Sequence, residues 1–345
     1  MDVERVVLAR PRGFCAGVEM AIKALAWMCR LFEPPVYCYH EIVHNRLVVD
    51  RFAELGVVFV DDVAEVPPGA PLMLSAHGSA PEVVAAARER ASVVVNAVCP
   101  LVTKVHHEMK VRANKGYTVI YVGHAGHEEA IGTMAVAPGS ARLVENEQEV
   151  DSLEDLSGEV ALLAQTTLSA DDWGGVMARA KERYPDLWMP GRSDLCFATT
   201  NRQGALRAIA DEVDAVVVIG SANSSNTVAL EKVAGTAGCS RVLRVNAASE
   251  LPDDLAGVVG VTAGASAPEE LVRDVLARLA PRQGIAEVHV TDEDEYFPPP
   301  RELRDLLRAV ATGVGAAVGA PPDPAKPLAD DREMAASDAL DALAS

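Results

Sequence analysis

The chain has 345 residues, of which 49% are hydrophobic and 23% charged, which is the composition of a soluble globular protein with room for two or three domains. A net charge of -19 and an aromatic content of 4% argue against a nucleic-acid partner, which would favour a basic surface and stacking side chains. No run of about 18 apolar residues is present, so no membrane span is expected. The start MDVERVVLARPRG carries acidic residues early, unlike a signal peptide, and we expect a cytoplasmic protein.

Short apolar runs with the length and β-branched content of buried strands recur along the chain. In chain order they lie at 6–9, 36–40, 57–60, 72–76, 93–98, 118–123, 160–165, 215–220, 241–245 and 257–264. Helices are predicted between them, among others at 17–32, 81–90, 101–114, 170–184, 200–212 and 268–280. Because strands alternate with helices, we predict an α/β fold of βαβ units with mainly parallel sheets.

Each third of the chain offers one cysteine before a helix and two polar turns after strands. The polar turns lie at His44 and His77, at His127 and Thr166, and at Ser224–Asn226 and Ser266. Ligands of open parallel sheets bind at the carboxyl ends of the strands, where such turns lie. We therefore predict three similar domains, over 14–97, 98–193 and 194–284, that point their strand ends at one centre, with 1–13 and 285–311 packing as terminal segments.

The last part of the chain, 312–345, is rich in Ala, Pro, Gly and Asp and has few large apolar residues. This composition predicts a disordered tail, within which SDALDALA could form a short helix.

Cys15, Cys99 and Cys196 each stand at the start of a predicted helix, where the helix dipole and free N–H groups favour a thiolate. Three converging thiolates would form a metal site. Zinc would want a fourth protein ligand, whereas iron–sulfur clusters accept ligands that are distant in sequence. The alternative is three helix-start cysteines with no common role, and the spacing alone does not decide between the two. Cys29, Cys38 and Cys239 are interpreted as packing or surface residues.

The polar turns favour an anion site, because His, Ser and Asn side chains in front of helix N-termini can bind phosphate. The candidates are His44, His77, His127, Ser224, Ser225, Asn226 and Ser266. Any single serine can instead be only a helix cap. The sequence has no P-loop or dinucleotide motif, so ATP and NAD(P) are poor candidates.

Glu129 follows His127 at the start of a helix and is the better candidate for proton transfer than Glu128, because a parallel sheet would place it beside the turn QTTL. His106, His107 and His124 are assigned to solvent or packing.

Nine motifs, in this order, resemble the 4-hydroxy-3-methylbut-2-enyl diphosphate reductase family. They are PRGFCAGV, VHNR, SAHG, CPLVTKVH, GHAGHEE, QTTLS, CFATTNRQ, GSANSSN and VTAGASAP. The resemblance extends from about residue 6 to FPPPRELR near residue 300. It implies a trefoil of three α/β domains around one [4Fe–4S] cluster per chain, with Cys15, Cys99 and Cys196 as ligands and one iron lacking a protein ligand.

The resemblance also implies the last step of the methylerythritol phosphate route to isoprenoids. The allylic hydroxyl of the substrate would bind the open iron and leave as water, giving isopentenyl and dimethylallyl diphosphate. His44, His77, His127, Ser224, Ser225, Asn226 and Ser266 match the positions around the diphosphate, and Glu129 and Thr166 match the pair that delivers protons. Ferredoxin or flavodoxin would supply the electrons, and the protein would be a monomer or a homodimer.

Ala135 departs from the family, which often has glycine after GTM, and this can alter a nearby turn. The motifs leave three other readings open: an iron–sulfur hydro-lyase acting on another anion, a paralogue of low activity, and a redox sensor without catalysis.

Overall fold

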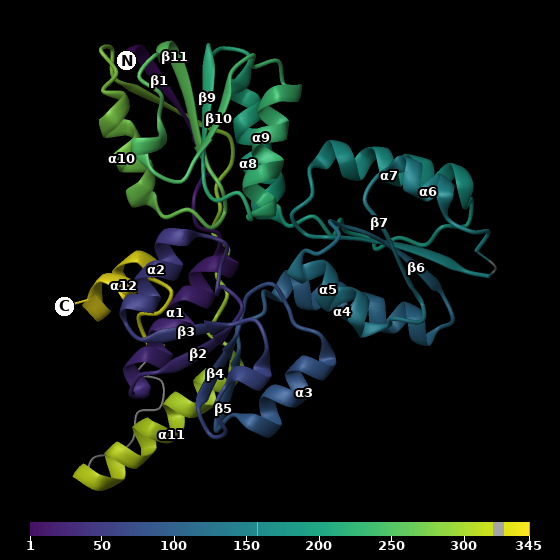
Figure 1. The fold of residues 1–345 in the computed structure, drawn as a ribbon, viewed down its shortest axis with the longest axis vertical. Helices are drawn as coiled ribbons and strands as arrows, with labels where there is room; N and C mark the ends of the chain where they lie inside the picture. The colour runs from purple at the N-terminus through teal and green to yellow at the C-terminus, as the bar shows by residue number, and fades with distance from the viewer. Residues whose placement is uncertain (157, 320–327, 345) are drawn as a thin grey trace. The chain divides into compact units, whose positions relative to one another are not determined.

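The computed structural model describes residues 1–156, 158–319 and 328–344, and the chain divides into two compact units (Figure 1). Unit 1 comprises Met1–Cys15, His44–Arg46 and Leu101–Asp294. Unit 2 comprises Ala16–Val43, Leu47–Pro100 and the described residues from Glu295 onward.

Unit 2 contains a four-stranded parallel sheet in the order β3-β2-β4-β5. Its strands are β2 (Val36–Tyr39), β3 (Val57–Val60), β4 (Pro71–Leu74) and β5 (Val93–Asn96). Its helical segments are α1 (Ala16–Leu31), α2 (Arg46–Glu54, whose first residue belongs to unit 1), η1 (Val63–Glu65) and α3 (Pro81–Arg90). Leu72 and Leu74 of β4 are fully buried and pack against Val63, Val66 and Ala87.

The larger sheet of unit 1 is five-stranded and parallel, in the order β10-β9-β11-β1-β12. Its strands are β1 (Asp2–Arg10), β9 (Ala215–Ile219), β10 (Val242–Val245), β11 (Ala256–Ala263) and β12 (Ile285–His289). Helices α8 (Phe197–Ala210) and α9 (Ser225–Thr236) cover one face and α10 (Glu269–Leu279) the other (Figure 1), while η2 (Ala248–Glu250) follows β10. The N-terminal strand therefore lies inside this sheet, with Val6 opposite both Val259 and Ile285.

The second sheet of unit 1 is three-stranded and parallel, in the order β7-β6-β8. Its strands are β6 (Thr118–Val122), β7 (Ala141–Val144) and β8 (Val160–Ala164). Helices α4 (Pro100–Asn114) and α5 (Glu128–Val136) lie on one face, and α6 (Glu147–Ser152) and α7 (Ala170–Arg183) on the other (Figure 1). All five residues of β8 are buried, as its continuous apolar run predicts.

The predicted α/β class with parallel sheets is confirmed, and the three sheets are built from the three predicted thirds of the chain plus β1 and β12. The domain boundaries themselves stay a prediction. The strands β7 and β12 are missing from the predicted set; each lies at the edge of its sheet, beside β6 and β1 respectively. No helix in the described ranges is long and apolar enough to cross a membrane.

The prediction of a disordered tail from residue 312 is wrong for the described residues. Helix α11 (Arg301–Val318) runs past that point, and α12 (Ala336–Ala344) packs on α1. The predicted short helix SDALDALA is thus part of α12. Residues 320–327 and 345 of the predicted tail lie outside the described residues.

A buried lysine joins α1 to the segment before α12. Lys23 is only 4% exposed, and its Nζ donates to the Asp331 carbonyl at 2.7 Å and the Met334 carbonyl at 3.2 Å, and lies 3.4 Å from Asp331 Oδ2. Tyr296 donates its hydroxyl to the same carboxylate oxygen at 2.9 Å. Leu340 of α12 is also buried. The composition of the tail did not predict this docking, because the docking depends on Lys23 and Tyr296, which lie outside the tail.

We expect Lys23→Met to lower the free energy of unfolding by about 3–5 kcal/mol, because it leaves a buried carboxylate without its cation. Urea unfolding followed by circular dichroism measures this loss. Lys181→Met, at an exposed lysine, is the control and should change the free energy by less than about 0.5 kcal/mol. An unfolding midpoint of Lys23→Met equal to that of the parent would contradict the docking.

Candidate active site

The candidate residues of unit 1 lie where strands end and helices begin. Cys15 follows β1 and its N–H donates to the Ala265 carbonyl, just after β11, at 3.2 Å. His127 and Thr166 follow the neighbouring strands β6 and β8. Parallel strands thus bring these turns to the carboxyl edges of their sheets, as the sequence predicts.

The segment before Cys196 runs beside β8 in the same direction. Trp188 pairs with Ala161, and the Asp194 carboxylate accepts the N–H of Ala164 at 3.1 Å. Cys196 then donates its own N–H to the Thr166 carbonyl at 3.0 Å. This pairing places the third cysteine next to the candidate proton-transfer residue.

Cys196 is the N-cap of α8, which begins three residues earlier than predicted. Its Sγ accepts the N–H of Thr199 at 3.2 Å and lies 2.9 Å from the Thr199 hydroxyl. Burial raises the pKa of Cys196 to about 11, and the neighbouring Cys15 adds to the rise. Burial therefore opposes the thiolate that the helix start is expected to favour at Cys196.

Glu129 is buried in the first turn of α5 and holds both of its oxygens against Thr166. Its Oε1 accepts the Thr166 N–H at 2.7 Å and its Oε2 accepts the Thr166 hydroxyl at 2.9 Å. Burial raises the pKa of Glu129 to about 7, the two bonds from Thr166 oppose the rise, and the Asp194 carboxylate adds to it. A carboxyl with this pKa can give and take a proton near neutral pH.

His127 caps α5, since its Nδ1 accepts the Glu129 N–H at 3.1 Å. Burial, with His44 and His124 near it, lowers the pKa of His127 to about 4. The sequence predicts an imidazolium in this turn, but the ring is neutral at pH 7 and carries its proton on Nε2. It can still donate one hydrogen bond to an anion.

The His44 turn is tied to the strand ends of the five-stranded sheet. Ser266 donates its hydroxyl to the His44 carbonyl at 2.9 Å, and Asn223 Nδ2 lies 3.5 Å from His44 Nδ1. The His44 and His127 rings meet edge to face with their centroids 5.5 Å apart. Unit 1 therefore brings His44, His127 and Ser266 together.

The turn Ser224–Asn226 caps α9, where Ser224 accepts the Thr227 N–H at 3.4 Å. Ser225 Oγ accepts from Gln165 Nε2 at 3.2 Å and lies 3.3 Å from His124 Nδ1. Asn226 bridges the first turn of α8 and the turn after β11, with its Nδ2 on the Thr199 hydroxyl at 3.2 Å and its Oδ1 on the Ala265 N–H at 2.9 Å.

His124, which the sequence analysis assigns to solvent or packing, therefore contacts the candidate site residue Ser225, and Gln165 is a second contact that the sequence analysis missed. The signal available in the sequence was the pair of histidines in GHAGHEE, which share one turn after a strand. By contrast, His106 is largely buried, which lowers its pKa to about 4 and fits the packing role predicted for it.

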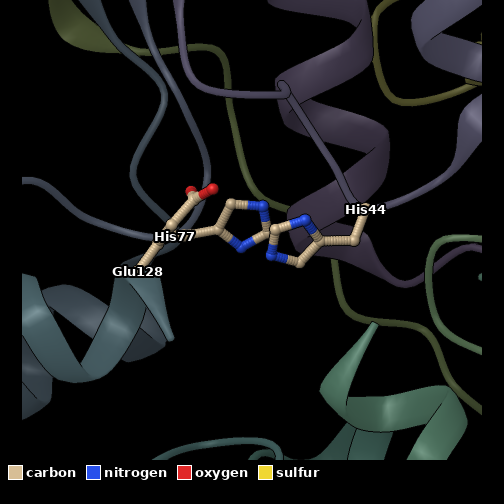
Figure 2. Close-up of side chains that lie close together, drawn as sticks. All are labelled: His44, His77 and Glu128. Carbon is tan, nitrogen blue, oxygen red and sulfur yellow. The ribbon is translucent and has the colours of Figure 1, made fainter. Parts of the chain in front are cut away.

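Two candidates belong to unit 2. Cys99 follows β5 and immediately precedes α4, and its N–H donates to the Ala76 carbonyl at 3.0 Å. His77 follows β4 in the turn before α3. Figure 2 labels this imidazole of unit 2, and it also labels His44 and Glu128, which belong to unit 1. Both candidates of unit 2 occupy the kind of turn that the sequence predicts.

The three remaining cysteines have packing environments. Cys38 lies buried in β2, and Cys239 is buried with its Sγ on the Arg241 carbonyl at 3.3 Å. Burial raises the pKa of Cys29, on α1, to about 11.

Comparison with known proteins identifies the family. The family model described as LytB protein matches residues 6–280. This chain belongs to the LytB protein family. The family resemblance seen in the sequence is thereby confirmed.

Curated relatives of this chain are named 4-hydroxy-3-methylbut-2-enyl diphosphate reductase. The protein from Rhodopirellula baltica is 46% identical over 310 residues, covering 88% of this chain and 97% of the relative. The protein from Mycobacterium ulcerans is 46% identical over 309 residues, covering 87% of this chain and 92% of the relative.

The fold also matches solved structures. The structure of the E-1-hydroxy-2-methyl-but-2-enyl-4-diphosphate reductase from Plasmodium falciparum aligns with a TM-score of 0.86 and 30% sequence identity, over 90% of this chain and 99% of that chain. A second structure, of (E)-4-hydroxy-3-methyl-but-2-enyl diphosphate reductase, the terminal enzyme of the non-mevalonate pathway, aligns with a TM-score of 0.58 and 28% identity.

Proposed function

We propose that this chain reduces (E)-4-hydroxy-3-methylbut-2-enyl diphosphate to isopentenyl diphosphate and dimethylallyl diphosphate, as the terminal enzyme of the non-mevalonate pathway. The family match and the names of the relatives confirm the reductase predicted from the sequence. The observation that carries the proposal is the buried Glu129–Thr166 pair hydrogen-bonded beside Cys196. It joins a proton donor to a candidate cluster ligand.

Cys15, Cys99 and Cys196 are proposed to hold one [4Fe–4S] cluster with one iron free of protein ligands. The donor set of unit 1 fits such a group, because Cys15 and Cys196 are both free cysteines at helix starts and cysteine sulfur is the usual ligand of iron–sulfur clusters. Cys99, in unit 2, enters the proposal on its family motif. When bound, the cluster would supply a Lewis acid for the substrate hydroxyl and a path for two electrons.

The protein's own residues would hold and move the proton. Glu129 keeps a proton near pH 7 because burial raises its pKa, and Thr166 fixes both carboxyl oxygens. Glu129 would give this proton to the leaving hydroxyl, so that two electrons and two protons convert the substrate to product and one water. The Thr166 hydroxyl, which donates to Glu129 Oε2, would then return a proton to Glu129.

The diphosphate would lie among the polar turns, since donors there are already oriented. Neutral His127 offers its Nε2 proton, and Ser225 and Asn226 lie at the N-terminus of α9, where free N–H groups favour an anion. His44, Ser224 and Ser266 line the same strand ends, and His77 belongs to the proposal on its motif.

We expect Ser225→Ala to raise KM for the substrate about 10- to 100-fold, because a hydrogen bond to a charged group contributes about 1.5–3 kcal/mol. Steady-state kinetics under anaerobic conditions measures the change. Ser152→Ala, at an exposed serine whose hydroxyl donates to the Gln148 carbonyl at 2.9 Å, is the control. A KM of the Ser225 variant equal to that of the parent would remove this serine from the diphosphate site.

The proposal is tested by anaerobic incubation of iron-replete protein with substrate, with and without a strong one-electron reductant. Formation of five-carbon diphosphates only with the reductant supports it. Turnover without the reductant would favour an iron–sulfur hydro-lyase, and absence of turnover in the parent protein would favour a redox sensor or an inactive paralogue.

Ferredoxin or flavodoxin as electron donor, and a cytoplasmic location, belong to the same proposal.

A further inference from the structure

Arg202 is the largest fully buried side chain of the described residues and lies between the two cysteine turns of unit 1. It stands on α8, six residues after the N-cap Cys196. Its Nε and Nη2 donate to the Gly13 carbonyl at 3.0 and 2.8 Å, and Nη2 also donates to the Phe14 carbonyl at 3.1 Å. Gly13 and Phe14 are the two residues that immediately precede Cys15.

The remaining donors of the guanidinium fix its orientation. Nη1 donates to the Ala198 carbonyl within α8 at 2.9 Å and to both Glu293 oxygens, at 2.9 and 3.0 Å. Asn201 Nδ2 donates to Glu293 Oε1 at 3.0 Å. These bonds to two carbonyls of one loop and to a carboxylate of another segment fix the orientation of the planar guanidinium. A lysine ammonium lacks the geometry to make the same set of bonds.

The loss of hydration of the buried Arg202 guanidinium indicates a role for this residue beyond packing. A buried ion pair gains little over an apolar pair of similar volume, because both ions lose their hydration. Here the buried cation also lies near a candidate ligand, since Arg202 Nη2 donates to the carbonyl of Phe14, the residue before Cys15. Side chains that orient metal ligands without touching the metal typically affect metal affinity about 10- to 100-fold.

We infer that Arg202, held by Glu293, is a positioning residue that fixes Cys15 relative to Cys196 and places a positive charge beside their cluster. This inference rests on the proposed function, because it assumes that the two cysteines bind iron. Helix α8 begins at Cys196 and carries Arg202, whose side chain binds the loop that precedes Cys15. Loss of the hydrogen bonds from Arg202 to this loop should speed the loss of the cluster. Loss of the positive charge should lower the reduction potential of the cluster.

The test compares anaerobically purified parent protein with Arg202→Lys, Arg202→Met and the double variant Arg202→Met/Glu293→Gln. Arg207→Lys is the matched control, because Arg207 lies on the same helix but pairs with Asp171 at the surface. The rate of cluster loss to an iron chelator is followed by absorption, and the reduction potential by anaerobic redox titration. Circular dichroism verifies that each variant is folded.

All three Arg202 variants are expected to lose the cluster about 10- to 100-fold faster than the parent and the Arg207 control. The Arg202→Met potential should lie below that of Arg202→Lys, which keeps the charge. The double variant, which removes both charges, should have a potential nearer to that of the parent while still losing its cluster quickly.

Chelation rates and potentials equal to those of the parent in Arg202→Lys and Arg202→Met would overturn the inference. Neither readout requires turnover, so a parent that holds a cluster but makes no product would contradict the proposed function alone. For a parent that holds no iron, the comparison is the rate of alkylation of Cys15 and Cys196 in the folded chain, read by mass spectrometry. Faster alkylation in the Arg202 variants supports the positioning, and equal rates overturn it.

Discussion

Glu129→Gln is expected to lower turnover by about 10²- to 10⁴-fold while leaving the iron content unchanged, because it removes a positioned proton donor and keeps its shape. The amide oxygen of the substituted side chain can still accept the Thr166 N–H that Glu129 Oε1 accepts at 2.7 Å. Anaerobic turnover with substrate and reductant, measured beside the iron content, separates the loss of the proton from the loss of the cluster. Glu212→Gln, at an exposed carboxylate, is the control.

The dependence of kcat on pH in the parent protein should also show that Glu129 acts as the proton donor. Burial holds the pKa of Glu129 at about 7, with Asp194 adding to the rise and Thr166 opposing it. A group that acts as an acid must be protonated, so kcat should fall as the pH rises above about 7. The residual activity of Glu129→Gln should lack this decline, and an unchanged profile would remove Glu129 from proton transfer.

The variant should also be more stable than the parent at high pH. The folded pKa of Glu129, about 7, lies above its ordinary value of 4.5, so folding favours the protonated form and stability falls as the pH rises from 4.5 to 7. At pH 8 the neutral amide side chain should raise the free energy of unfolding by about 3 kcal/mol, from 1.36 kcal/mol per pKa unit. Denaturant unfolding at pH 5 and pH 8 measures this, and the gain should be small at pH 5.

Cys196→Ser is expected to abolish stable cluster binding and reduce turnover to background, because serine offers no thiolate to iron at this buried helix start. Iron and sulfide content, together with the charge-transfer absorption of the cluster, measure the loss. Cys239→Ser is the matched control, since Cys239 is buried in the same unit, where its Sγ donates to the Arg241 carbonyl and it packs in a hydrophobic cluster. A Cys196 variant that keeps the iron content of the parent would remove this residue from the ligand set.

The sequence predicts the α/β class and the turns that carry the site, because both follow from local patterns. Buried parallel strands such as β8 are continuous apolar runs, and the polar residues after them mark the strand ends. The position of β1 inside the five-stranded sheet is not local, because it depends on pairing with β11 and β12, which lie near the other end of the chain.

The parts of the site that were missed depend on tertiary packing. The neutral state of His127 and the raised pKa of Cys196 follow from burial, which the sequence pattern does not give. His124 contacts a candidate site residue because the fold places Ser225, the first residue of α9, beside it. Likewise, Arg202 looks like an ordinary helix residue until the fold places the Gly13 carbonyl against its guanidinium.

The most direct test of the reductase function is an anaerobic electron titration of turnover. Iron-replete protein is mixed with 4-hydroxy-3-methylbut-2-enyl diphosphate and a measured amount of one-electron reductant, and the five-carbon products are quantified. We predict that two electrons are consumed for each molecule of isopentenyl or dimethylallyl diphosphate formed. Product formed without consumption of electrons, or no product from protein with a complete cluster, would contradict the reductase function.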